Sequence, residues 1–101
     1  MANIKLFKFV SGEEIIADVK SNETDRFVIE DAVTLVYRPQ EGGQMTVGFA
    51  PFMPYAAGEI KIYKSSVISE SDPQDDLKNE FNRIFGAGIV VAQANDAAFK
   101  I

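Results

Sequence analysis

The chain has 101 residues, 47% of them hydrophobic, and its 10 basic and 15 acidic side chains give a formal net charge of −5. Because it contains no Cys and no His, the sequence excludes thiol nucleophiles, Ser-His relays, zinc fingers and imidazole metal ligands. A chain of this length predicts one domain, whose core is marginal unless partner chains enlarge it.

We expect no secretory signal at the N-terminus and no membrane-spanning segment. The N-terminal segment MANIKLFKF lacks the long apolar region and the small-residue cleavage site of a secretory signal. No run of about 18 apolar residues is present, which is the length that a membrane-spanning helix needs. We therefore expect a cytoplasmic protein with no membrane partner, and the absence of Cys agrees with a reducing compartment.

The first part of the chain predicts two strands. Residues 4–10 form an apolar run in which the odd spacing of the lysines indicates a bulge near Leu6–Phe7. Residues 14–20 alternate between apolar and more polar side chains, as a half-buried strand does. Ser11–Gly12 separates the two strands, and a polar loop follows the second.

Two further strands are predicted on either side of a glycine turn. Residues 26–38 have apolar side chains at alternate positions over an unusually long stretch, which favours one long, bent strand. Gly42–Gly43 supplies the positive φ that a hairpin reversal needs. Residues 45–53 form the fourth strand, and Pro51 and Pro54 place it at a sheet edge because proline cannot donate ladder hydrogen bonds.

Residues 60–69 predict a fifth strand with a polar interruption at Lys64–Ser66. Five short strands within about 70 residues are typical of a small barrel. The sequence thus predicts an all-β fold, a five-stranded, bent antiparallel barrel over residues 1–70.

Residues 71–101 predict a C-terminal helix followed by an apolar tail. Asp72 is a suitable N-cap, Pro73 a suitable first helical residue and Gly86 a suitable C-terminal cap, which places the helix at 73–85. We expect the tail to be docked on the barrel or on a neighbouring subunit, because it is too apolar to remain in water. The helix should dock by the apolar stripe Leu77, Phe81, Ile84 and Phe85.

Two segments resemble the paired motifs of the Sm-like family, the small barrels that include the Sm and LSm proteins and bacterial Hfq. The first is FVSGEEIIADV at 9–19 followed by FVIEDA at 27–32. The second is IKIYKSSVIS at 60–69, in which Tyr63–Lys64 is similar to the Tyr-Lys of Hfq. The resemblance covers residues 4–69 and is that of a divergent bacterial or bacteriophage-type member.

The resemblance implies a barrel of the SH3 type that assembles into a homo-oligomeric ring of about five to seven subunits. In such a ring the fourth strand of one subunit pairs with the fifth strand of the next. The pore-facing loops would bind single-stranded RNA weakly, and the residues that match them here are Arg26, Lys64, Ser65 and Ser66.

Two hypotheses of function stay open at this point. One is an RNA-binding ring; the other is a structural or protein-interaction ring with no nucleic-acid partner. The loop at 22–26 has no aromatic side chain to stack a base, and the net charge opposes phosphate binding. Neither hypothesis involves an enzyme, a cofactor, a metal ion or double-stranded DNA.

Overall fold

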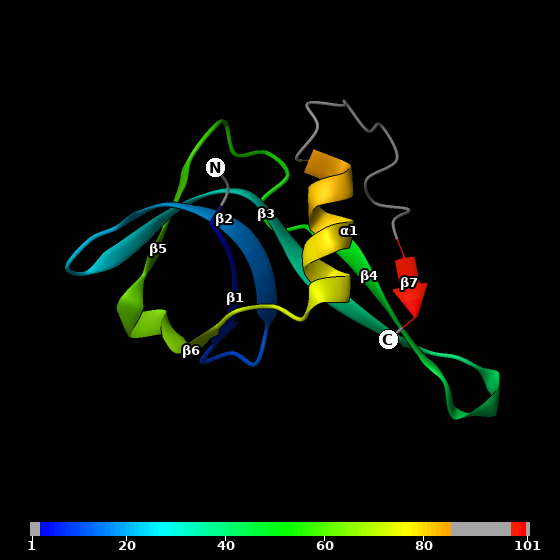
Figure 1. The fold of residues 1–101 in the computed structure, drawn as a ribbon. Helices are drawn as coiled ribbons and strands as arrows, with labels where there is room; N and C mark the ends of the chain where they lie inside the picture. Colours follow the sequence, from blue (N-terminus) through cyan, green and yellow to red (C-terminus); the bar gives the residue numbers. More distant parts are fainter. Residues whose placement is uncertain (1–2, 86–97, 101) are drawn as a thin grey trace.

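The computed structural model describes residues 3–85 and 98–100 of the chain (Figure 1). Within these residues the strands form one antiparallel sheet in the order β6-β1-β2-β3-β4-β7, with β5 also paired to β3. No helix among them is long and apolar enough to cross a membrane. The strands are β1 (Ile4–Phe9), β2 (Glu14–Asn22), β3 (Arg26–Pro39), β4 (Met45–Pro51), β5 (Ile60–Tyr63), β6 (Val67–Ser71) and β7 (Ala98–Lys100).

The all-β class is confirmed, but the closed five-stranded barrel is wrong. The predicted fifth strand at 60–69 is two strands that pair with different partners, β5 with β3 and β6 with β1. Between them Lys64–Ser66 forms a 3-10 turn, η2, which redirects the chain. In the described part of the chain no ladder joins β5 to β6, so the sheet does not close into a barrel.

The long, bent third strand is confirmed as β3. Its first half, from Arg26 to Ile29, pairs with β5, and its second half, from Val33 to Pro39, pairs with β4. Asp31 lies between the two halves with a φ of 58°, a left-handed conformation that Asp tolerates better than most residues. This bend lets β3 pair with β5 along its first half and with β4 along its second half, in addition to its pairing with β2. A second 3-10 turn, η1 (Glu41–Gly43), connects β3 to β4.

The sheet is buried on both faces, and each face has its own core. This explains the odd spacing in β1: Ile4 and Phe7 belong to different cores, so no bulge is needed near Leu6–Phe7, and the register shift lies at Lys8/Phe9 instead. The helix-side core contains Ile4, Ile16, Val33, Leu35, Val47, Phe49, Leu77, Phe81 and Ile84. The other core contains Phe7, Phe9, Ile15, Ala17, Phe27, Ile29 and Ile62.

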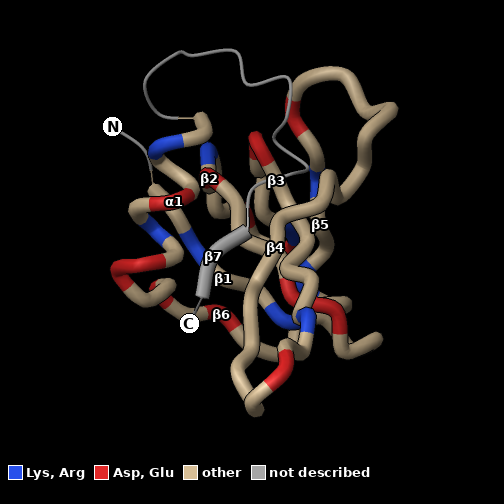
Figure 2. Tube along the Cα trace, turned by 90° about the vertical axis from the view of Figure 1, so that its right-hand side faces the viewer, with Lys and Arg blue, Asp and Glu red and all other residues tan. Residues whose placement is uncertain are grey.

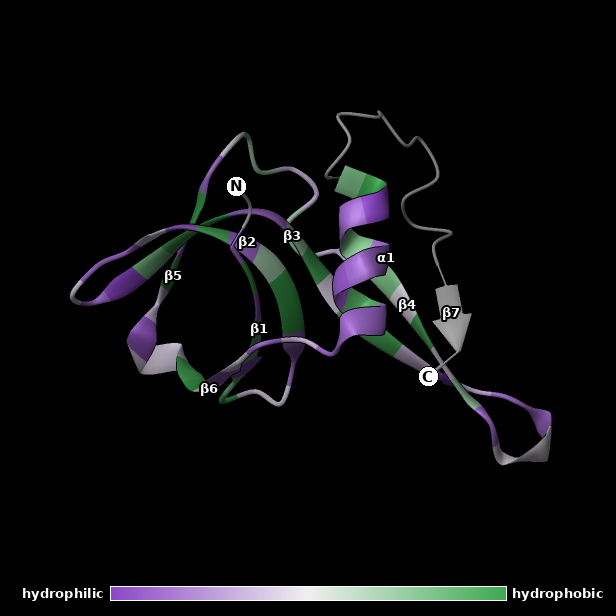
Figure 3. Cartoon of the chain, in the orientation of Figure 1, coloured by the Kyte–Doolittle hydropathy of each residue, from purple (hydrophilic) through white to green (hydrophobic). Residues whose placement is uncertain are grey.

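The C-terminal helix, α1 (Asp75–Phe85), covers one of these cores with its apolar stripe. Figure 3 shows the alternation of hydrophobic and hydrophilic turns along it. The helix begins at Asp75 and not at Pro73, so the predicted cap at Asp72 is wrong. The Asp72 carboxylate lies 2.6 Å from Lys5 Nζ and so connects the approach to α1 with β1. The predicted cap at Gly86 lies outside the described residues.

The last described strand, β7, pairs with β4 of the same chain, with Val47 opposite Phe99. The fourth strand ends at Pro51, earlier than the predicted 53. Its outer edge is occupied by β7 along 46–48. The free edge that the ring prediction assigned to the fourth strand is covered over this stretch. The rest of the predicted tail, residues 86–97 and 101, lies outside the described residues.

Tyr37 provides a test of the packing of β3 against β2. Its hydroxyl donates a hydrogen bond of 2.6 Å to Glu14 Oε1. Partial burial and this carboxylate raise the pKa of Tyr37 from 10.0 to about 12. Because the folded state then holds the proton more tightly than the unfolded state, this contribution to stability is lost as the pH rises from about 10 to 12. A pH titration followed by phenolate absorbance should show one tyrosine that ionises near pH 12, and Tyr37→Phe should remove this step. A titration curve of Tyr37→Phe with the same shape as that of wild type would contradict the assignment.

Candidate nucleic-acid interface

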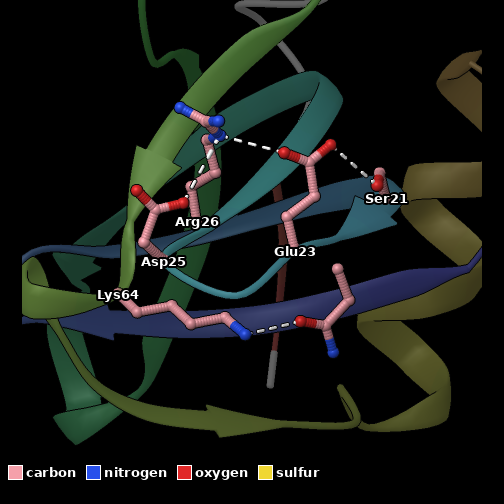
Figure 4. A network of polar contacts seen from close by, with 6 residues as sticks. Ser21, Glu23, Asp25, Arg26 and Lys64 are labelled. Atoms are coloured by element: carbon pink, nitrogen blue, oxygen red, sulfur yellow. Dashed lines mark hydrogen bonds and ion pairs between the residues drawn. The ribbon is translucent and has the colours of Figure 1, made fainter.

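The structure brings two of the predicted RNA-contacting residues together. Arg26 opens β3 and pairs in register with Tyr63, the last residue of β5. The backbone N–H of Lys64 then donates a 2.9 Å hydrogen bond to the carbonyl of Asp25. The β2–β3 turn and η2 are thereby fastened to each other, so Arg26 and Lys64 lie on adjoining turns (Figure 4).

The Arg26 guanidinium is held by carboxylates of its own turn. Its Nε lies 2.9 Å from Glu23 Oε1 and 3.5 Å from Asp25 Oδ1. The hydrogen bond to Glu23, followed by the charge of Asp25, raises the pKa of Arg26 above its ordinary value. Ser21 donates a further bond of 3.1 Å to the other Glu23 oxygen (Figure 4). The positive charge of Arg26 is therefore compensated before any ligand arrives.

Lys64 is positioned differently. Its Nζ donates a 2.7 Å hydrogen bond to Asn22 Oδ1, a neutral acceptor, and lies 4.8 Å from the centre of the Phe27 ring. Within the described residues no carboxylate lies at ion-pair distance from it. The amide and the ring fix the direction of the ammonium without neutralising its charge. Lys64 is thus an oriented cation that can still accept an anionic partner.

A cavity of about 320 Å³ adjoins this ammonium. Asn22, Phe27 and Lys64 form one side of it, and the β6 residues from Val67 to Glu70 form the other. Phe27 is only 5% exposed, so it supplies a wall and not a free stacking face. The ammonium and the amide can hold a phosphate or a base edge in this cavity without strong base stacking, although the Glu70 carboxylate, which also lines it, opposes an anion.

The two serines do not share this cavity. The Ser66 carbonyl accepts a 2.9 Å hydrogen bond from the Val10 N–H, and Ser66 lines a separate groove beside Phe52 and Tyr63. Ser65 is exposed on η2 and lines neither of these two hollows. The role of both serines in RNA binding stays a prediction.

Sequence reasoning missed Asn22 and Phe27 as neighbours of Lys64. Phe27 matched the alternating apolar pattern of β3, and Asn22 was interpreted as an ordinary loop residue. Asn22 ends β2 and Phe27 is the second residue of β3, so their position on either side of one turn was the available signal. Their meeting with Lys64 depends on the pairing of β3 with β5, which the residues alone do not specify.

The surroundings of the site are mixed in charge. In the view of Figure 2 acidic and basic residues are interspersed along the trace. In the described part of the chain no group of three His, Cys, Asp or Glu side chains could hold a metal ion. Comparison with known proteins returns no matching family model and no matching curated protein.

Proposed function

We propose that the protein assembles into an Sm-like ring that binds single-stranded RNA weakly through Lys64. The observation that supports this function is the Lys64 ammonium, which is oriented by Asn22 and Phe27 at the mouth of a cavity but paired with no carboxylate among the described residues. A fixed cation beside a polar hollow is suited to a phosphate and the adjoining base edge. A ring repeats this cation once per subunit around one axis.

The chemistry of the site limits the strength of binding. Arg26 is already compensated by two carboxylates, so each subunit offers about one effective cation in these loops. The affinity for nucleic acid comes largely from the neutralisation of phosphates, and the net charge of −5 opposes the approach of a polyanion. Binding should therefore be weak, strongly dependent on salt and dependent on the number of subunits in the ring.

Free sheet edges support assembly into a ring. In the described residues β5 and β6 each pair on one side only, and each presents an exposed apolar side chain, Tyr63 at 49% and Ile68 at 58% exposure. An open edge is a template for strand addition by another chain. Pairing β6 of one subunit with β5 of the next uses two different edges, which generates a closed ring when the rotation permits.

The mass in solution tests the ring. We expect light scattering at micromolar concentration to give a mass several times the 11.1 kDa of one chain. Ile68→Glu should lower this mass, because it places a charge on the proposed β6 interface. Tyr55→Glu is the matched control: Tyr55 is 99% exposed but lies in the loop between β4 and β5. A wild-type mass near 11.1 kDa would refute the ring.

A ring without a nucleic-acid partner is the second candidate function. The compensated charge of Arg26 favours it, because a residue selected to contact phosphate would gain from an unpaired guanidinium. This candidate predicts that the oligomer forms and that RNA fails to bind. The mass measurement and the RNA measurement together distinguish the two.

A further inference from the structure

A second cavity, of about 460 Å³, lies at the bend of β3. The end of β4, the loop at 52–59, the start of β5 and Phe85 at the end of α1 complete it. None of the residues that line it also lines the cavity beside Lys64. Its volume is in the range of sites that enclose a small organic molecule.

The walls of this cavity are mixed, with apolar side chains beside two carboxylates. Phe49, which is 2% exposed, and the half-buried Phe85 both line it, together with Pro51 and Met53. No Lys or Arg is among the described residues that line it, whereas Glu30 and Asp31 both are. A ligand that fits must therefore have an apolar body and must not carry a negative charge.

Asp31 is an exposed carboxylate that pairs directly with no cation among the described residues, although the charge of Lys20 acts on it at longer range. Glu30 lies 3.5 Å from Lys20 Nζ, and the same ammonium lies 2.9 Å from Asp18 Oδ2. Asp31 forms no hydrogen bond or ion pair within the described residues. Partial burial, followed by the charges of Glu30 and Asp18, raises the pKa of Asp31. Three carboxylates thus share one ammonium, and the excess negative charge lies at the cavity.

The backbone explains why Asp31 lies there. Its φ of 58° is the one positive value at a residue other than glycine in the described part of the chain. A left-handed residue within a strand costs free energy, and such residues often occur where a side chain must be placed for function. The bend brings the carboxylate to the rim of the cavity instead of into the regular sheet.

We propose that this cavity binds a small organic cation, an ammonium carried on an apolar body. The charged group would lie against the Asp31 carboxylate, and the apolar body would pack against the half-buried Phe85 and the exposed Met53. A carboxylate beside apolar side chains is suited to an organic ammonium group, because the carboxylate attracts its charge and the apolar side chains accept its carbon skeleton. This proposal does not depend on RNA binding, since the two cavities share no residue.

Three probes of one shape but different charge test the proposal by calorimetry or by NMR titration. They are phenethylamine, phenethyl alcohol and hydrocinnamate. We expect the amine to bind about tenfold more tightly than the alcohol, because one partly desolvated ion pair contributes on that order. Hydrocinnamate should bind least. Equal affinity for amine and alcohol, or no binding by any of the three, would overturn the proposal.

Two variants locate the site and one controls for charge. Asp31→Asn removes the charge but keeps a residue that tolerates a positive φ, and it should abolish the preference for the amine. Ala56→Phe fills the cavity from an exposed loop position and should weaken all three probes. Glu41→Gln removes the same charge at the distant η1 turn and should change nothing. An amine preference that survives Asp31→Asn would contradict the assignment.

Discussion

Lys64→Glu is expected to abolish the binding of short single-stranded RNA. The substitution replaces an oriented ammonium by a carboxylate beside Asn22, and a ring repeats this change in every subunit. Each phosphate contact contributes a slope of about −0.7 to the dependence of log affinity on log salt for single strands. The affinity for RNA should therefore fall by more than about tenfold at low salt, and any residual affinity should depend less on the salt concentration. Fluorescence anisotropy of labelled oligo-U and oligo-A measures both effects.

Two control variants make this result specific. Lys78→Glu causes the same change of charge on the exposed face of α1, away from the site, and should leave the affinity nearly unchanged. Lys64→Arg retains the positive charge and should retain most of the binding. If Lys78→Glu weakens RNA binding as much as Lys64→Glu does, net charge and not Lys64 determines the affinity.

Phe81→Ala should lower the free energy of unfolding by about 3–5 kcal/mol, the usual cost of removing a buried aromatic side chain. Phe81 is 2% exposed, and its ring centre lies 4.8 Å from that of Phe85. It belongs to the core beneath α1 together with Leu77 and Ile84, so its loss leaves a cavity that the sheet cannot fill. Urea unfolding of both proteins, with slopes compared, measures the difference.

Arg83→Ala is the control for this prediction. Arg83 lies on the exposed side of the same helix and pairs only with Glu80 among the described residues. Exposed pairs contribute about 0–1 kcal/mol, so this variant should unfold close to wild type. If Phe81→Ala were as stable as Arg83→Ala, the docking of α1 on the sheet would be wrong.

The sequence was sufficient to predict most of the strands because apolar alternation and turn residues are local signals. Gly42–Gly43 marked the β3–β4 turn. The prolines predicted an edge strand, whereas β4 pairs with β3 on one side and with β7 along 46–48 on the other. The split of the last predicted strand could not be derived, because it depends on β5 and β6 finding different partners. In β1 the apolar side chains on both faces looked like a bulge, because the sequence alone does not show that both faces of the strand are buried.

The candidate site was predictable only in part. Lys64 and Arg26 were identified from the loops they occupy, and the structure brings them to adjoining turns. The contact of Lys64 with Phe27 arises from the β3–β5 ladder, so no local pattern predicts it. The ion pairs of Arg26 with Glu23 and Asp25 are local, but the sequence alone does not show that these side chains meet. The cavity at Asp31 was not predicted at all, because its walls come from segments that only the bend of β3 brings together.

The most direct test of the central claim is the retention of short single-stranded RNA by the wild-type protein at about 50 mM salt, where phosphate contacts are least screened. The account predicts weak but measurable binding of oligo-U or oligo-A by a multimeric species. This binding should decrease steeply as salt is added. If an intact oligomer retains neither RNA under these conditions, RNA binding through Lys64 is refuted and the protein-interaction ring takes its place.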